Sequence, residues 1–431
     1  MDLIYDISRL TTRVLNATPN GIDWIDTLLA DHFLSRPGER TYSLVFGWRG
    51  PRLFRPNTLP NPVLDLNRLW GHEPPDGNAP TQTPDFAVSG SSRASVRGRR
   101  ETGSAFRRGA DYTRGIGRAI RTYGLARGLD PTRNAPAGSI YLNASHFPLD
   151  WPSHVAWLRM RRDVRPVFFI HDILPILHPQ YFWRSEPARH ARRLALLAEL
   201  GAAAIVTSEI VAGELREAMA ARGRFDLPIY RAAPPVKPVF LKPFEGCPKP
   251  FDSRYFVVCG TIEPRKNHLL LAAVWRRLVE KYGKATPKLV VIGKRGWHCE
   301  EIVAALKHPA LDGIVVEASA LDTRAYRALL AGACALLSPS FAEGFGLPLA
   351  ESLAAGTPAI VSDIPSHREV GKGAPVYLGP ENAIDWLDTI ESFMETDAPA
   401  RQATLERVMR HTPTSANAYL QDVMGFLQTL A

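Results

Sequence analysis

Residues 338–363 read SPSFAEGFGLPLAESLAAGTPAIVSD, and this stretch decides the fold. The four residues before it, 334–337, are apolar enough for a buried parallel strand. After the glycine loop EGFG, residues 347–355 have helical spacing, and Pro348 suits the first helical turn because its missing N–H has no intrahelical partner there. Residues 357–362 form a second buried strand. The stretch therefore predicts a strand–helix–strand unit of a parallel α/β sheet.

Two carboxylates bracket this glycine loop: Glu343 precedes the glycines, and Glu351 lies one turn into the helix. The amides and positive dipole end of that helix face the loop, where an anionic group is stabilised. The glutamates have two interpretations, a binding site or helix-flanking charges without a function. The glycines and the proline between them, with a strand on either side, favour a binding site.

The segment E-G-F-G-L-P-L-A-E resembles the E-x7-E signature of retaining glycosyltransferases of the GT-B fold, particularly glycosyltransferase family 4. The resemblance implies that Glu343 lies against the transferred sugar and that Glu351 hydrogen-bonds the ribose of the donor nucleotide. It also implies a loop that holds the donor diphosphate. The loop residues that take this role are Gly344, Phe345, Gly346 and Leu347.

A second segment rich in charge, GTIEPRKN, ends at Asn267 and follows a predicted strand. Arg265 and Lys266 precede a helix that Asn267 could cap, and two cations suit a diphosphate leaving group. Two basic residues without a function would be unfavourable at a helix start. The segment resembles the phosphate-binding segment of family 4, which places Gly260 and Thr261 at the donor. Many members have an arginine where this chain has Thr261, so the cationic role falls on Arg265 and Lys266.

A third segment of this half, VIGKRGW, occupies residues 291–297 and also resembles the family. The resemblance implies that Gly293 and Lys294 border the nucleotide base.

The N-terminal end of the chain has a short strand at residues 3–7, a loop to Gly21 and a helix at residues 22–33. The segments YDISRL and TPNGID resemble the opening of bacterial family 4 enzymes. That likeness implies that Gly21 belongs to a loop closing over the donor phosphates or the acceptor. A plain turn, in which glycine supplies backbone freedom, is the alternative.

A buried strand, VRPVFFIHD, ends in His171 and Asp172. Side chains just past the carboxyl ends of parallel strands line the ligand crevice. The segment IHDILP resembles the H-D segment of family 4, which implies that His171 contacts the transferred sugar. A histidine tied to a backbone carbonyl at the strand end is the alternative.

The predicted fold class is α/β, with two doubly wound Rossmann-like domains facing each other across a cleft, the GT-B arrangement. Residues 1–235 form an acceptor domain, residues 236–250 a proline-rich linker, and residues 251–411 a nucleotide-sugar domain. The GT-B resemblance implies that the last helix, about 412–431, completes the first domain. Further strands are expected at residues 40–48, 138–145, 203–208, 227–233, 255–259, 288–292, 314–317 and 376–378, and further helices at 209–221, 268–282, 322–332 and 381–394. Residues 403–430 are expected to form one or two amphipathic helices.

The net charge of +9 is uneven, because eleven arginines and no lysine lie in residues 93–133. Such a tract suits anionic lipid headgroups, nucleic acid or a pyrophosphate, or it is a solvated, partly disordered loop. Residues 110–128 have roughly helical spacing. No signal peptide or membrane span is evident, and the four cysteines lack metal-ligand spacing, which indicates reduced thiols and no metal site. They are Cys247, Cys259, Cys299 and Cys334.

The resemblance to family 4 implies a retaining glycosyltransferase that moves a sugar from a nucleotide diphosphate sugar to a polyprenyl-diphosphate-linked or oligosaccharide acceptor in bacterial polysaccharide biosynthesis. The resemblance favours GDP-mannose as donor, with a UDP-sugar second. We expect no cofactor and no metal, since fixed cations are present and no D-x-D triplet occurs. We also expect a cytoplasmic protein bound peripherally to the anionic inner face of the membrane. The alternatives are a GT-B sugar-nucleotide epimerase or an arginine-rich nucleic-acid-binding protein. The second lacks interleaved aromatic residues and leaves the two glutamates unexplained.

Overall fold

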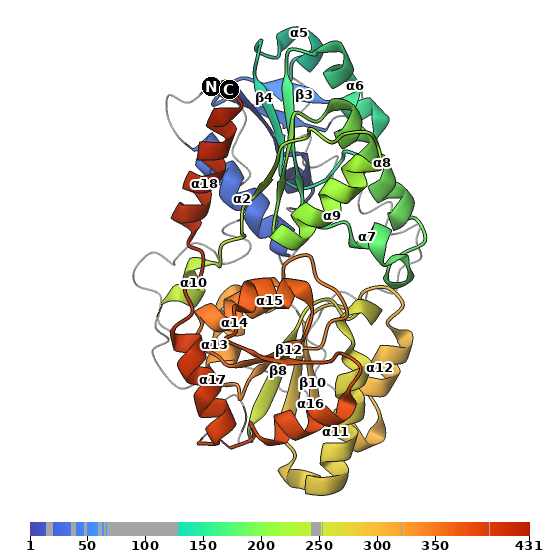
Figure 1. Cartoon of the computed structure of the whole chain (residues 1–431), viewed down its shortest axis with the longest axis vertical. Coiled ribbons are helices and arrows are strands. Elements are labelled where there is room, and N and C mark those ends of the chain that lie inside the picture. Colours follow the sequence, from blue (N-terminus) through green and yellow to red (C-terminus); the bar gives the residue numbers. More distant parts are fainter. Residues whose placement is uncertain are drawn as a thin grey trace.

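The structure is a computed structural model that describes residues 1–13, 20–35, 40–46, 50–58, 128–242, 253–319, 321–395 and 397–431, together with residues 63, 66 and 251. They form two α/β domains, each built on one sheet, and the domains are stacked along the long axis of the molecule (Figure 1). The predicted fold class, two doubly wound α/β domains, is confirmed.

The N-terminal domain contains a seven-stranded sheet in the order β3-β2-β1-β4-β5-β6-β7. All neighbours are parallel except β2 and β3, which are antiparallel. The strands are β1 (Leu3–Asp6), β2 (Thr41–Val45), β3 (Arg52–Phe54), β4 (Ile140–Asn143), β5 (Arg165–Ile170), β6 (Ala203–Val206) and β7 (Ile229–Arg231).

Both faces of this sheet are buried, because successive residues of each strand point to opposite sides. Leu3 and Tyr5 pack in one core with α2 (Gly21–Leu34), whereas Ile4 packs in the other with α8 (Glu186–Leu200). Other helices among the described residues of the domain are α1 (Ser8–Arg13), α5 (Pro131–Asn134), α6 (Pro152–Met160), α7 (Leu174–Leu177), the 3-10 turn η2 (Pro179–Tyr181) and α9 (Glu209–Ala220).

The C-terminal domain contains six strands, all parallel to their neighbours, in the order β10-β9-β8-β11-β12-β13. An order that reverses on either side of β8 is that of a doubly wound sheet, whose ligands bind beyond the carboxyl ends of the strands. The strands are β8 (Tyr255–Cys259), β9 (Lys288–Ile292), β10 (Val315–Ala318), β11 (Leu336–Ser338), β12 (Ala359–Ser362) and β13 (Val376–Leu378).

Helices cover both faces of this second sheet. Phe256 and Val258 pack with α11 (His268–Tyr282) on one face, and Val257 packs with α14 (Leu347–Ala354) on the other. The other elements are the 3-10 turns η3 (Pro264–Lys266), η4 (Gly283–Ala285) and η5 (Pro309–Leu311), and α12 (Glu300–Leu306), α13 (Thr323–Gly332), α15 (Pro365–Gly371) and α16 (Ala383–Glu391).

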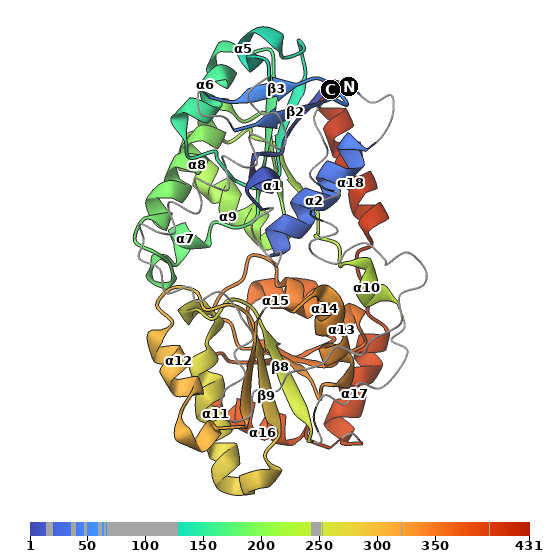
Figure 2. The same cartoon turned by 180° about the vertical axis from the view of Figure 1, so that it is seen from behind.

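Two segments connect the domains. The first leaves β7 and enters α10 (Pro238–Leu241). The second joins α17 (Pro399–Met409), which packs in the C-terminal domain, to α18 (Ala416–Thr429), which lies beside α2 in the N-terminal domain. The Val236 amide donates to the Thr414 carbonyl at 3.2 Å, so the two connections are tied together. Both chain ends therefore lie at the same end of the molecule (Figure 2).

Several local predictions need correction. Helix α1 occupies residues that we expected in a loop. The expected strand at residues 40–48 is shorter. Asn267 does not cap α11: its backbone is left-handed and its side-chain amide donates to the Pro339 and Pro380 carbonyls instead. Most of the arginine tract and the helix expected at residues 110–128 lie outside the described residues, apart from Gly128.

Candidate active site

Helix α14 begins at the glycine loop, as predicted. Gly346 takes a φ of +97°, a conformation that favours glycine, and it places the chain at the helix start without a side-chain cap. Pro348 lies in the first turn. The first amides of a helix lack intrahelical partners, so the N-terminus of α14 is a favourable place for an anion.

Glu343 lies immediately before this loop and is held by two cations. Its carboxylate accepts hydrogen bonds from Arg265 Nη1 at 2.8 Å and Lys266 Nζ at 2.5 Å, and from Ser340 Oγ at 2.7 Å. Burial alone would raise its pKa, but Arg265 and Lys266 outweigh burial and hold the pKa of Glu343 well below its usual range. Glu343 is therefore a carboxylate across the physiological range.

Arg265 is the centre of this cluster. Its Nη2 donates to Glu263 Oε1 at 2.7 Å and its Nη1 also donates to the Ala342 carbonyl at 2.6 Å. Burial lowers the pKa of Arg265, but Glu343 and Glu263 raise it by more than burial lowers it. The pKa therefore lies above its ordinary value, and the guanidinium stays charged. Its Nε is buried without a hydrogen-bond partner.

The ends of β8 and β9 pack against each other behind these cations. Gly293 has a φ of +159°, and a Cβ there would lie 1.9 Å from the Gly260 carbonyl oxygen, so only glycine fits. The Lys266 side chain contacts Gly260. Lys294 is exposed, and Thr261 is half-buried against Gly296. Of the predicted residues in this half, Gly260 is thus beside the cations, whereas Lys294 is exposed.

Glu351 is 7% exposed within α14. Burial raises its pKa, and Lys237 in the segment before α10, with Nζ 3.6 Å away, opposes that rise. Sequence reasoning missed Lys237, which lies in a proline-rich stretch with no periodic pattern.

His171, at the end of β5, directs Nε2 at the Ala144 carbonyl at 2.7 Å, so Nε2 is the donor nitrogen. Its own backbone amide donates to His146 Nε2 at 2.9 Å. Burial lowers the pKa of His171 to about 4, so the ring is neutral at neutral pH. The structure thus shows the alternative considered for His171, a histidine bound to a backbone carbonyl at the end of a strand.

The two domains meet at the glycine loop. Ser208 Oγ, at the N-terminus of α9, donates to the Gly344 carbonyl at 3.0 Å. A Cβ on Gly344 would lie 2.7 Å from Asp172 Cβ and 2.9 Å from the His171 carbonyl oxygen. Gly21, the first residue of α2, lies against the Leu347 side chain. The structure thus brings the predicted residues His171, Gly21 and Gly344 to one place between the domains.

Further contacts hold the domains together beside the loop. Glu369 of α15 accepts hydrogen bonds from the Glu209 and Ile210 amides at 2.9 and 3.3 Å, which closes the N-terminus of α9 from the opposite domain. Trp297 Nε1 donates to the Tyr181 carbonyl at 2.6 Å.

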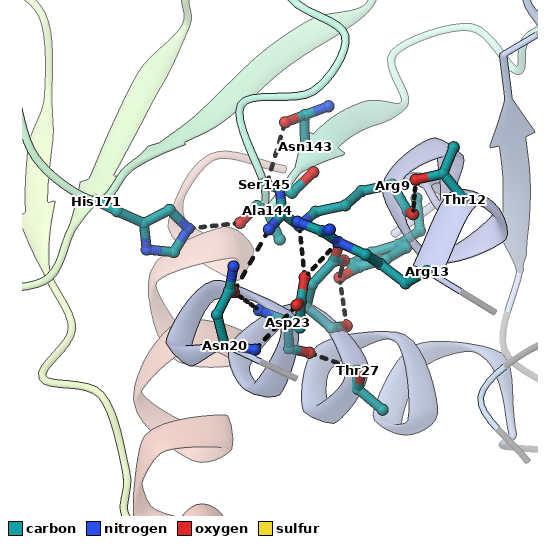
Figure 3. A network of polar contacts seen from close by, with 12 residues as sticks. Arg9, Thr12, Arg13, Asn20, Asp23, Thr27, Asn143, Ala144, Ser145 and His171 are labelled. Atoms are coloured by element: carbon teal, nitrogen blue, oxygen red, sulfur yellow. Dashed lines mark hydrogen bonds and ion pairs between the residues drawn. The ribbon is translucent and has the colours of Figure 1, made fainter. Parts of the chain in front are cut away.

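A second charged cluster, missed from the sequence, lies on the N-terminal domain near His171 (Figure 3). Asp23 is 1% exposed and accepts from Arg9 Nε at 2.8 Å and Arg13 Nε at 2.9 Å. Asn20 and Asp23 also form a capping box that closes the start of α2. The spacing Asn20–Asp23 is a recognisable capping signal, but nothing local in the sequence pairs the two arginines with Asp23.

No helix among the described residues is long and apolar enough to cross a bilayer. The same residues contain no group of three or more histidine, cysteine or acidic side chains arranged to hold a metal ion. The expectation that no metal is required stays a prediction.

Comparison with solved structures agrees with the GT-B class. The structure of Anabaena HepE in complex with UDP aligns over 100% of both chains with a TM-score of 0.61 at 12% identity, which shows the fold alone. Two stacked α/β domains that meet at a glycine loop are the GT-B fold. Residues 244–408, which include most of the C-terminal domain, match the family model described as Glycosyl transferases group 1.

Curated relatives agree with this class. The serotype-specific mannosyltransferase WbdA of Escherichia coli is 27% identical over 261 residues, 53% of this chain and 29% of WbdA. The O-antigen chain mannosyltransferase B of Escherichia coli is 30% identical over 128 residues, 30% of this chain and 33% of that protein. The matches thus span only about a third of the length of these relatives.

Proposed function

We propose that this chain is a retaining hexosyltransferase of bacterial polysaccharide biosynthesis. GDP-mannose, which would supply mannose, is the favoured donor, and a UDP-sugar is the second candidate. The acceptor is a lipid-linked or free saccharide. The observation that carries the proposal is that Arg265 and Lys266 both form ion pairs with Glu343, shortly before the uncapped start of α14. This arrangement places two cations, a carboxylate and free helix amides within one loop, as transfer from a sugar diphosphate requires.

In this proposal the cations exchange partners when the donor binds. Arg265 and Lys266 turn from Glu343 to the diphosphate, and the amides of Phe345, Gly346 and Leu347 bind its oxygens. The bond from the sugar C1 to the diphosphate breaks and its electron pair leaves with the nucleoside diphosphate. The acceptor hydroxyl oxygen forms the new bond to C1, and its proton passes to an oxygen of the departing diphosphate. Each charge-matched donor contributes about 3–4 kcal/mol where water is excluded.

The carboxylates and His171 orient the donor. Glu343, ionised and freed from the cations, accepts hydrogen bonds from the sugar hydroxyls, and Glu351 accepts them from the ribose. His171 donates through Nε2, so its neutral Nδ1 accepts from a sugar hydroxyl across the domain boundary. Gly260, Thr261, Gly293 and Lys294 border the nucleotide, and Gly21 approaches from α2.

Two relatives named as mannosyltransferases support mannose as the transferred sugar. The names also refer to O-antigen chains and serotype, which supports a saccharide acceptor of surface polysaccharide. The UDP bound to HepE keeps a UDP-sugar as the second choice.

The donor is identified by thermal-shift titration with GDP-mannose, UDP-glucose, UDP-N-acetylglucosamine, ADP-glucose and dTDP-glucose. A ligand at a hundred times its Kd stabilises the folded protein by about 2.7 kcal/mol, so the right nucleotide raises Tm by several degrees. The Lys266→Met variant should lose this shift. The absence of a shift with every nucleotide sugar, or an undiminished shift in the variant, would contradict the donor site.

We also propose that the arginine tract, most of which lies outside the described residues, binds an anionic membrane surface where polyprenyl-diphosphate acceptors reside. Co-sedimentation with phosphatidylglycerol vesicles should fall with salt and with substitution of the arginines in residues 93–108 by glutamine. Binding that survives both changes would rule out this role.

A further inference from the structure

Lys237 reaches the donor domain from the segment that connects the two domains. It is the residue before α10, and its Nζ lies 3.6 Å from Glu351 Oε1, with side chains only 15% and 9% exposed. The segment is fixed directly before Lys237, because Trp24 Nε1 donates to the Pro235 carbonyl at 2.9 Å and the Val236 amide donates to the Thr414 carbonyl. The ammonium group is therefore delivered to Glu351 by an ordered backbone.

The Lys237 ammonium group favours the charged form of Glu351. Burial of its carboxyl raises its pKa, and Lys237 is the group that opposes the rise. The other titratable groups that face it are Cys259 on β8 and Tyr326 on α13, and neither is a cation.

In the part of the chain that the structure describes, titratable groups on two other helices packed on α14, namely α15 and α17, have partners other than Glu351. His367 of α15 contacts the Ser362 carbonyl and Ser338 Oγ. Arg407 of α17 donates to the Ala374 carbonyl and Thr404 Oγ1. Within the described residues, Lys237 is thus the cation at ion-pair distance from Glu351.

We propose that Lys237 is a positioning residue of the donor site, which keeps Glu351 charged and aimed at the nucleotide ribose. The inference rests on the proposed function, which assigns the ribose to Glu351. A carboxylate accepts both ribose hydroxyls, whereas a protonated carboxyl group has one oxygen committed as a donor. Because Lys237 belongs to the connection between the domains, it links the ribose contact to the position of that segment.

The test compares each nucleotide with its 2′,3′-dideoxy counterpart, using UDP and GDP as probes. Calorimetric Kd values are measured from pH 5.5 to 9, and the ratio of the two affinities is taken at each pH. Titration of the phosphate groups cancels in this ratio, so the ratio reports the ribose contact. The variants are Lys237→Met, Lys237→Arg and Glu351→Gln, with Lys242→Met as the matched control on an exposed lysine of the same segment.

The wild-type ratio should fall as the pH falls through the raised pKa of Glu351. Loss of the neighbouring cation should move that fall upward by about one pH unit or more in Lys237→Met. Lys237→Arg and Lys242→Met should follow the wild type, and Glu351→Gln should give a low ratio at every pH. Equal Tm values establish that each variant is folded.

Two results would overturn the inference: a wild-type profile in Lys237→Met, or an equal loss for ribose and dideoxyribose nucleotides at every pH. The second result would indicate a structural role for Lys237. A wild-type ratio in Glu351→Gln would instead remove the ribose contact from the proposed function. The two failures are therefore distinguishable.

Discussion

In the N-terminal domain Asp23 binds Arg9 and Arg13, and in the C-terminal domain Glu343 binds Arg265 and Lys266. Both clusters consist of two cations that share one carboxylate at the start of a helix, and both lie near the contact between the domains. In both, the carboxylate is at least nine-tenths buried. Judged by charge and burial alone, either could bind an anionic ligand.

The difference lies in the helix that follows. Asp23 is itself part of the capping box of α2, so its helix end is closed by its own side chains. Glu343 stands outside α14, whose start is formed by Gly346 and has no side-chain cap. Cations beside an open helix end can bind a diphosphate jointly with the amides, whereas cations beside a closed one mainly join two helices. The uncapped N-terminus of α14, and not the excess of cations over carboxylates, therefore distinguishes the candidate donor site from the Asp23 cluster.

The largest expected effect is on catalysis. Lys266→Met should lower kcat by about a hundredfold to a thousandfold, because a preorganised donor to the leaving group is lost. Arg13→Met should change kcat less than about threefold, since α2 is closed. Steady-state kinetics with the identified donor measures both, with Lys281→Met as the control for an exposed lysine in an ion pair. Equal losses in Lys266→Met and Arg13→Met would erase the distinction between the clusters.

This contrast also explains what the sequence could reveal. The glutamates, glycines and proline of residues 343–351 lie within nine consecutive positions, so their spacing alone predicted the loop, the helix and its open start. Arg265 and Lys266 were found for the same reason. The alternation of apolar strands and helices was enough for the fold class, because doubly wound sheets bury both faces.

The rest depends on contacts between distant residues. Arg9 and Arg13 lie in a segment that we took for a loop, and only the folded α1 turns them toward Asp23. Lys237 reaches Glu351 across 114 residues of sequence, and Ser208 reaches Gly344 across 136. Asn267 shows the opposite case, because its residue type and position predicted a helix cap. Its side chain instead donates hydrogen bonds to two carbonyls that tertiary folding brings close to it. No local pattern records such pairings.

A smaller effect, on stability, should appear in the N-terminal cluster. Asp23→Asn leaves Arg9 and Arg13 without their carboxylate, which should lower the free energy of unfolding by about 3 kcal/mol, since breaking a mostly buried pair leaves an uncompensated charge. Urea unfolding measures the loss. Glu199→Gln, which breaks the exposed Arg159–Glu199 pair, should cost less than about 1 kcal/mol. Unchanged stability with a large loss of kcat in Asp23→Asn would move this cluster into the active site.

The smallest expected effect is the pH dependence of stability that arises from one buried histidine in each domain. Burial lowers the pKa of both His171 and His268 to about 4, so the folded state binds fewer protons than the unfolded chain. Each should therefore reduce stability as the pH falls from about 6.5 toward 4, by about 2 kcal/mol at pH 5. The free energy of unfolding, measured in urea, should differ between pH 8 and pH 5. His171→Gln and His268→Gln should each reduce this difference by about 2 kcal/mol. Only His171→Gln should also slow transfer, because the His171 backbone lies against Gly344 of the glycine loop. A matching loss of kcat in His268→Gln would show that the kinetic effect follows from burial and not from contact with the sugar.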